Sequence, residues 1–330
     1  MERRAARRQE RPGPAPRGAR AWTTRVRPAV YFGWHVHPWE ELLDLVRRAE
    51  ALGFAAAFVD GDVTMLAARP DADCLDGWTV TTALLTATEH ISIGSVRLVH
   101  HWNAARLAQA AATAERIAPG RLRVVVTIGD WEIDTRFGLP MPPVGERVAW
   151  LGESLEALRA LWAGDTVTRR GSHVQLDRAR VRPAPGAALE IAVAAGRPRM
   201  LDLVARHAGV WEVSLPPVPA RVAAAADQLA AACVRRGRDP AELGRSMLLF
   251  ARPGASAAHA LAEYRCLNPW FADVPDSEIA PGLVSGDPSS CREQLHDMAR
   301  TLGLTLPVID ASGLAAEPTR RLLEALAPAK

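Results

Sequence analysis

The chain has 330 residues, 48% of them hydrophobic and 23% charged, which is enough for one large domain or two small ones. No stretch approaches twenty uninterrupted apolar residues, and the start of the chain lacks the apolar segment of a signal peptide, so we expect a cytoplasmic protein without membrane spans. The cysteines have no Cys-x-x-Cys spacing, which is typical of free thiols rather than of disulfides or a zinc site; they are Cys74, Cys233, Cys266 and Cys291.

Positive charge is concentrated at the start of the chain. Residues 1–27 hold nine arginines and two glutamates, a net charge of +7 against +3 for the whole chain, so the remainder carries −4. This segment is poor in bulky apolar residues and contains several prolines, which predicts a disordered basic tail over residues 1–26 and one folded domain over residues 27–330. A basic arm can bind nucleic acid or anionic lipid, but a solvated extension is the commoner role, and we expect neither partner.

Apolar strand patterns and helical patterns alternate along the first half of the domain. The sequence predicts strands over residues 28–34, 54–59, 91–99 and 122–128, and helices over residues 38–52, 78–89, 104–117 and a segment ending at Trp162. Pro38 suits the first turn of the first helix, and Gly53 ends it.

A hairpin around Gly171 interrupts this alternation, which then resumes. Strands are predicted over residues 189–194, 210–213, 247–251 and 306–309, and helices over residues 199–207, 218–236, 288–302 and 317–326. About eight alternating strands and helices predict an α/β fold, a single (β/α)8 TIM barrel in which the hairpin and an irregular region over residues 253–285 are insertions. A doubly wound open sheet is the alternative, and it is less favoured because no Gly-x-Gly-x-x-Gly fingerprint follows the first strand.

Polar and titratable residues follow each of the first four predicted strands. They are His35 and His37, then Asp60 and Asp62, then His100, His101, Trp102 and Asn103, and finally Asp130 beside Trp131. In a barrel the carboxyl ends of the strands converge on one mouth, so we expect these side chains to surround an active site.

Three interpretations of that mouth compete. The first is a redox site in which His and Asp side chains transfer protons beside a flavin-like ring. The second is a metal site formed by His35 and His37 with acids such as Asp60, and it is less favoured because the further ligands of such barrels are not evident. The third is that the histidines are ordinary core or loop residues. For Asp130, which follows a glycine after an apolar strand, a catalytic role is favoured.

A second segment has the composition of an anion site. Ala194, Ala195, Gly196 and Arg197 join a predicted strand to a helix, where backbone N–H groups and the helix dipole favour a phosphate. The same pattern also occurs in ordinary turns, so both interpretations stay open. Lys330 is the only lysine, so a ligand phosphate would need arginine, hydroxyl or backbone partners.

Several short motifs, taken in order, resemble the luciferase-like monooxygenase superfamily, which contains the relatives of bacterial luciferase and their deazaflavin-dependent cousins. The central stretch holds Thr113, Gly120-Arg121, Gly129-Asp130-Trp131, Phe137-Gly138 and Leu161-Trp162. Further matches are Ala49 through Phe54, the segments 191–209 and 235–243, and Gly286-Asp287-Pro288. The resemblance covers nearly all of the chain from residue 28 to residue 328.

This resemblance implies a (β/α)8 barrel, usually a homodimer, that binds FMN or the deazaflavin coenzyme F-420 at the carboxyl ends of the strands. It implies a bulge with a non-prolyl cis peptide near Ser95-Val96, beneath the cofactor ring, and a cofactor phosphate loop over Ala194 to Arg197. It places Asp60 at a site acid, and Asp130 where some sugar-phosphate-oxidising deazaflavin members carry a catalytic acid.

The chain departs from the family pattern near the site. Gly61 stands where many members have histidine, His101 and Ala104 replace an arginine and a proline, and residues 94–101 are about two residues short. The proton-transfer residue therefore stays open among His101, His100 and His35 alongside the acids. We expect hydride transfer between the deazaflavin and a small organic substrate, because Gly129-Asp130 resembles that branch. An FMNH2-dependent monooxygenase and a non-catalytic flavin-binding barrel are the alternatives.

Overall fold

Eight parallel strands close into a barrel, which confirms the predicted fold class. The computed structural model describes residues 27–33, 37–61, 75–129, 137–185 and 189–328. Neighbouring strands pair in the order β1, β2, β3, β4, β7, β8, β9 and β12, and β12 pairs with β1 to close the ring. The strands are β1 (Ala29–Phe32), β2 (Ala56–Val59), β3 (Ser92–Leu98), β4 (Leu122–Thr127), β7 (Ile191–Ala195), β8 (Val210–Val213), β9 (Gly244–Leu249) and β12 (Leu306–Asp310).

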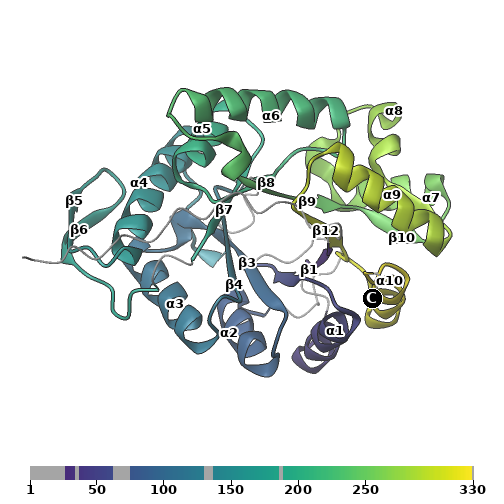
Figure 1. Cartoon of the computed structure of the whole chain (residues 1–330), viewed down its shortest axis with the longest axis horizontal. Coiled ribbons are helices and arrows are strands. Elements are labelled where there is room, and N and C mark those ends of the chain that lie inside the picture. The colour runs from purple at the N-terminus through teal and green to yellow at the C-terminus, as the bar shows by residue number, and fades with distance from the viewer. Residues whose placement is uncertain (1–26, 34–36, 62–74, 130–136, 186–188, 329–330) are drawn as a thin grey trace, which may run out of the picture.

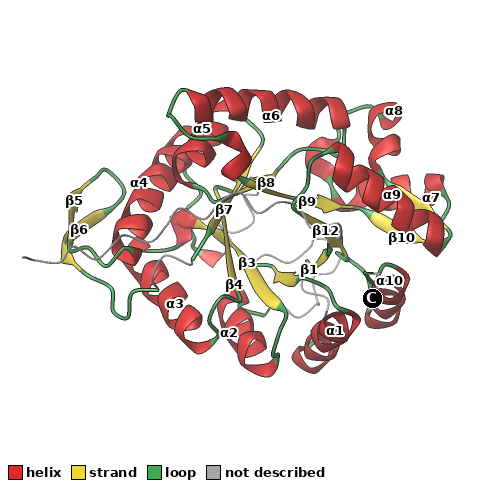
Figure 2. Ribbon diagram, viewed as in Figure 1, coloured by secondary structure: helices red, strands yellow, loops and turns green. Residues whose placement is uncertain are grey.

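Helices surround this barrel on the outside (Figures 1 and 2). They are α1 (Trp39–Leu52), α2 (Gly77–Ala87), α3 (Ala104–Ile117), α4 (Val144–Trp162), α5 (Pro198–His207), α6 (Pro219–Val234), α9 (Pro288–Thr301) and α10 (Ala316–Ala325). Each lies within a few residues of the predicted helix, because strong apolar periodicity and end signals coincide there. Asp287, for example, accepts hydrogen bonds from the backbone N–H groups of Ser289 and Ser290 at the start of α9. Within the described residues, none of the helices combines the length and the apolar character needed to cross a membrane.

The barrel strands separate two apolar clusters. Outward-facing residues such as Val30, Ile93 and Val193 pack against the helices in the main core. Inward-facing residues form a smaller cluster inside the barrel, which we call the lumen plug: Ala29, Ala56, Phe58, Val125 and Val308. Gly94 faces the Phe58 ring, where an added Cβ would lie 2.2 Å from Phe58 Cδ1, so the glycine makes room for the plug.

The predicted hairpin is confirmed as β5 (Val167–Arg170) paired antiparallel with β6 (Gln175–Ala179), and it projects from the side of the barrel (Figure 1). The prediction that residues 253–285 are irregular is wrong. They include α7 (Ala257–Leu267) and α8 (Asp276–Ile279), and the short strand β10 (Ala251–Pro253) pairs with β11 (Val284–Gly286). The many prolines and glycines hid a small core of their own around Phe250, Tyr264 and Ile279.

Three of the motif residues that carry the family resemblance are structural. Glu50 Oε1 accepts three backbone N–H groups, those of Glu89, His90 and Ile91, in the turn before β3. Arg121 donates to backbone and hydroxyl oxygens at the end of α2, on the other side of the same turn. Trp162 Nε1 donates to Ala108 O at 3.0 Å and joins α4 to α3. These contacts fix the connections between elements and take no part in a site.

Strand β3 corrects one expectation. In the described chain the only cis peptide bond is Arg182–Pro183, so the non-prolyl cis peptide expected near Ser95-Val96 is wrong. The strand pairs with β4 in unbroken register from Ile93 to Leu98. Continuous pairing leaves no extra residue from which to form a bulge.

Candidate active site

The carboxyl ends of β1 and β2 hold one partly buried polar pair, Tyr31 and Asp60. The Tyr31 hydroxyl donates to Asp60 Oδ2 at 3.0 Å, and the backbone N–H of Gly61 donates to Asp60 Oδ1 at 2.8 Å. Asp60 is buried, so both hydrogen bonds compensate for the water that its carboxylate loses. The predicted site acid is therefore held at a fixed position at the mouth of the barrel.

Close backbone packing explains why a glycine follows Asp60. A Cβ on Gly61 would lie 1.7 Å from Val96 O of β3, and a Cβ on Gly77 would lie 2.0 Å from Asp60 O. The chain after β2 thus passes directly against β3 and the start of α2. No side chain fits at position 61 without displacing β3, which accounts for the departure from histidine there.

A second carboxylate lies on the other side of Tyr31. Asp310 ends β12, is in register with Tyr31, and is buried. Its Oδ1 accepts the backbone N–H of Ser312 at 2.8 Å. The mouth therefore carries two buried carboxyl groups on strands that flank β1.

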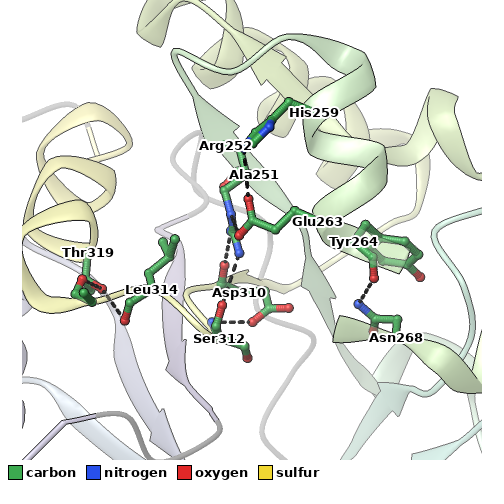
Figure 3. Close-up of polar contacts among 11 residues, drawn as sticks. Ala251, Arg252, His259, Glu263, Tyr264, Asn268, Asp310, Ser312, Leu314 and Thr319 are labelled. Atoms are coloured by element: carbon green, nitrogen blue, oxygen red, sulfur yellow. Dashed lines mark hydrogen bonds and ion pairs between the residues drawn. The ribbon is translucent and has the colours of Figure 1, made fainter. Parts of the chain in front are cut away.

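Arg252 fixes the chain around Asp310 (Figure 3). Its guanidinium donates to Asp310 O at 2.7 Å, to Ser312 O at 3.2 Å and to Glu263 Oε1 at 2.7 Å. Arg252 is only 5% exposed, so these bonds are made away from water. They join β10, the end of β12 and α7 into one unit.

The insertion also brings a phenol close to the mouth. Tyr264 of α7 is buried, and burial together with the nearby charge of Asp310 raises the pKa of its hydroxyl. The hydroxyl therefore stays protonated at any physiological pH and can only act as a neutral hydrogen-bonding group.

His100 and His101 form a one-turn 3-10 helix (Val99–His101) directly after β3, and their ring centroids lie 4.3 Å apart. His100 is 3% exposed and lies against Trp150 of α4, with 6.4 Å between ring centroids. Burial, followed by the charges of His101 and Arg147, lowers the pKa of His100 to about 4. His100 is therefore neutral at neutral pH and packs toward α4, which supports a structural role for it.

Arg147 of α4 holds the chain at the end of β4. Its guanidinium donates to Ile128 O at 2.6 Å, to Gly129 O, and to Pro142 O at 2.9 Å. These bonds position the residue that immediately precedes Asp130. Asp130 itself and His35 lie outside the described residues, as does Asp62.

The loop from β7 to α5 also meets the mouth. A Cβ on Gly196 would lie 2.3 Å from Ser214 O, so only glycine allows this approach to the end of β8. Arg197 precedes α5 without a side-chain cap, Pro198 starts the helix, and Arg197 and Arg199 are exposed. Uncapped N–H groups and two guanidinium groups make this loop suited to an anion.

The other predicted cofactor residues differ in the direction they face. Val96 belongs to the inward-facing set and is only half-buried, whereas Ser95 is buried on the helix side of β3 and is hydrogen-bonded to Arg97. Only the backbone of Ser95 can therefore contribute to the lumen. Ala194 faces the lumen, and Ala195 packs in the outer core.

The described residues provide no metal centre. No group of three or more His, Cys, Asp or Glu side chains is arranged to hold an ion within the segments the structure describes. His37 instead lines a cavity of ≈ 20 Å³ with Asp60, Leu42 and Val80, between the strand ends and α1 and α2. That volume holds about one water molecule and is far too small for a cofactor ring.

Sequence inspection missed three polar residues that face the lumen: Tyr31, Glu212 and Asp310. Asp310 was missed because the last strand was expected to end at Ile309, one residue early. Tyr31 and Glu212 lie within apolar strands. The signal that could have found them is a polar residue at an inward-facing position of such a strand.

Comparison with known proteins gives a consistent family. The profile described as luciferase-like monooxygenase matches residues 18–305. The F-420-dependent glucose-6-phosphate dehydrogenase of Nocardia farcinica is 38% identical over 126 residues, which are 37% of this chain and 36% of that protein. The enzyme of the same name from Intrasporangium calvum is 30% identical over 175 residues, 51% of each chain. The chain thus matches these curated relatives over about a third to a half of their length.

Solved structures share the fold over nearly the whole chain. An F-420-dependent secondary alcohol dehydrogenase in complex with an F-420–acetone adduct superposes with a TM-score of 0.78 at 19% identity, covering 92% of this chain and 99% of that one. An EDTA monooxygenase from Chelativorans superposes with a TM-score of 0.75 at 13% identity, covering 92% and 93%. At such identities the likeness shows the barrel architecture alone.

Proposed function

The chain belongs to the luciferase-like monooxygenase family, and from that premise we propose that it is a deazaflavin-dependent oxidoreductase that transfers a hydride to or from a small organic substrate. The observation that carries the proposal is the sequence match to F-420-dependent glucose-6-phosphate dehydrogenases at 30–38% identity. The substrate class that we propose is a small molecule with a carbon centre that can lose or gain a hydride. We propose further that the protein is cytoplasmic, as the scattered cysteines suggest, and that it forms a homodimer, as the family resemblance implies.

The loop between β7 and α5 supports the proposal, because its geometry suits the phosphate of such a cofactor. Gly196 allows a backbone approach that a side chain would block, and Arg197 supplies positive charge beside the uncapped helix. Val96 and Ala194 leave half-buried apolar surface on the lumen wall for a flat ring. When bound, the deazaflavin would supply the hydride acceptor or donor, and the protein would supply binding, orientation and proton transfer.

For proton transfer we propose Asp60 at the described mouth and His101 from the turn after β3, together with Asp130 and His35. Asp60 is supported by its fixed position beside Tyr31. Asp130 is supported by its place in the chain after Gly129, whose carbonyl Arg147 holds. His100 is excluded from this role, because its ring packs toward α4.

The test is a fluorescence titration of the purified protein with the deazaflavin, FMN and FMNH2, without substrate. We expect tight binding of the deazaflavin and weak binding of both forms of FMN. Arg197→Ala should weaken deazaflavin binding about tenfold through the loss of one charge-assisted hydrogen bond. Arg321→Ala is the matched control, because Arg321 is exposed on α10 and pairs with Glu317 of its own helix.

The alternatives predict different outcomes of the same experiment. A preference for FMNH2, with oxygen consumption on addition of substrate, would indicate a monooxygenase and contradict the proposal. Binding of the deazaflavin with no turnover of any candidate substrate would indicate a non-catalytic barrel. In an enzyme, Asp130→Ala should abolish turnover and retain the cofactor, whereas a binding protein has no turnover to lose.

A further inference from the structure

One carboxyl group inside the barrel has no part in the proposed site. Glu212 is the third residue of β8, between Trp211 and Val213, which both pack outward in the main core. Because side chains alternate along a strand, Glu212 points into the lumen. It lies in register with Ala194 of β7 on one side and Ser246 of β9 on the other.

Ser246 holds this carboxyl group in place. Its hydroxyl donates to Glu212 Oε2, and Ser246 itself is only 2% exposed. Within the described chain, Glu212 Oε1 has no hydrogen-bond partner, and Glu212 remains half-buried. Ser246 thus fixes one carboxyl oxygen against the barrel wall, and the carboxyl group faces the lumen.

The inner wall of the barrel beside Glu212 is not fully covered. Leu248, the next inward-facing residue of β9 beyond Ser246, is 40% exposed although it is part of a barrel wall. Leu248 pairs in register with Val308 of the lumen plug, which is buried. An exposed leucine and a half-buried glutamate on adjacent strands therefore both keep accessible surface inside the barrel, where the cofactor of the proposed function would bind.

We propose that Glu212, positioned by Ser246, is a proton-transfer residue for a hydroxyl-bearing substrate that binds in the lumen, a role that rests on the proposed deazaflavin chemistry. In the oxidative direction, the substrate O–H bond breaks and its proton passes to the Glu212 carboxylate. The adjacent C–H bond breaks, its hydrogen leaves with both electrons to the oxidised deazaflavin, and a C=O bond forms. In the reverse direction, protonated Glu212 returns the proton to the carbonyl oxygen.

The surroundings of Glu212 suit a group that must both accept and donate a proton near neutral pH. Burial raises the pKa of Glu212 to about 7, and the Ser246 hydrogen bond opposes that rise. The facing residues of β7 and β9 are Ala194, Ser246 and Leu248, none of them charged. Among the described residues, the other titratable groups that face the barrel interior are Arg123 toward the amino end and Tyr31, Asp60 and Asp310 at the mouth.

The decisive comparison is Glu212→Gln against Glu190→Gln. Glu190 is exposed at the amino end of β7 and pairs with Arg123, so it controls for loss of a carboxyl group from the same sheet. Binding of the deazaflavin is measured first by fluorescence, and turnover is then measured with 2-propanol, longer secondary alcohols and glucose 6-phosphate as probes. We expect Glu212→Gln to bind the deazaflavin within about twofold of wild type and to lose at least about 100-fold in kcat/KM for the oxidised alcohol.

Two further readouts separate proton transfer from a structural role. In wild type, kcat/KM for oxidation should rise with pH about a midpoint near 7, and this rise should be absent in Glu212→Gln. Ser246→Ala should move the midpoint upward and keep activity at high pH, because it removes the bond that lowers the pKa. Infrared titration without cofactor should show a protonated carboxyl band that disappears near pH 7 in wild type and Glu190→Gln only.

Unchanged kcat/KM and an unchanged pH profile in Glu212→Gln would overturn the inference, as would deazaflavin binding with no alcohol oxidised. The inference would also be overturned if the protonated carboxyl band disappeared at the ordinary pKa of a glutamate and not near pH 7. Failure of wild type to bind the deazaflavin would instead overturn the proposed function, and the infrared titration would still decide whether Glu212 is a neutral-pH acid.

Discussion

Tyr31 and Asp60 are joined across the first two strands of the barrel by a hydrogen bond of 3.0 Å from the phenol to the carboxylate. Tyr31 is also in register with Asp310, so one aromatic side chain separates two buried acids. The arrangement keeps Asp60 at a constant position at the mouth. Each oxygen of the Asp60 carboxylate thus accepts one hydrogen bond, from the Tyr31 hydroxyl or from the Gly61 backbone.

The Tyr31–Asp60 bond can be measured by a double-mutant cycle. Tyr31→Phe should lower the free energy of unfolding by about 1.5 to 3 kcal/mol, because the bond is partly buried and its acceptor is charged. Tyr31→Phe combined with Asp60→Asn should destabilise less than the sum of the single changes, by about 1 kcal/mol in urea denaturation. Tyr264→Phe is the control, since the chain has two tyrosines and the Tyr264 hydroxyl makes no hydrogen bond with described residues. Additive effects would show that the two groups are not coupled.

Arg252 should contribute to stability far more than a surface arginine. Arg252→Met removes the bonds of a buried guanidinium to Glu263, Asp310 and Ser312 and leaves Glu263 only His259 at 4.0 Å, so we expect a loss of about 3 kcal/mol in the free energy of unfolding. Arg300→Met breaks an exposed pair with Asp297 and should cost less than about 1 kcal/mol. Equal midpoints of denaturation for the two variants would refute the idea that Arg252 joins β10, β12 and α7.

The sequence was sufficient for the barrel but not for the whole mouth. Helices such as α3 (Ala104–Ile117) have an apolar stripe and clear ends, so their bounds follow from local rules. Tyr31, Glu212 and Asp310 could not be placed, because which face of a short strand points inward depends on closure of the sheet. The same long-range packing explains why no side chain fits at Gly61.

Stability should fall between pH 6.5 and pH 4 partly because of His100. Its pKa is about 4 in the folded protein against 6.5 in the unfolded chain, so the unfolded state binds more protons in this range. The contribution is complete above pH 6.5 and is lost as the pH falls toward 4, for a total of about 3 kcal/mol.

His100→Gln should therefore flatten the dependence of the unfolding free energy on pH within that window. His207, whose pKa is also lowered by burial, leaves a remaining slope. His296→Gln is the control for removal of a surface imidazole, because His296 is exposed on α9. If His100→Gln and wild type lose stability in parallel, the burial of a neutral imidazole is not the cause.

Replacement of glycine by alanine should have opposite effects on the free energy of unfolding at Gly61 and at Gly145. Gly61→Ala forces a Cβ to within 1.7 Å of Val96 O, so β3 or the Asp60 loop must move, and we expect a loss of at least about 2 kcal/mol in the free energy of unfolding. Gly145→Ala places its Cβ no closer than 3.6 Å to Arg199 Nη1 and replaces a glycine near the start of α4, so it should gain about 0.5 kcal/mol. Thermal and urea denaturation of the two variants measure both signs. A stable Gly61→Ala variant would mean that the chain after Asp60 can move away from β3, and the position of Asp60 would then not be fixed by packing.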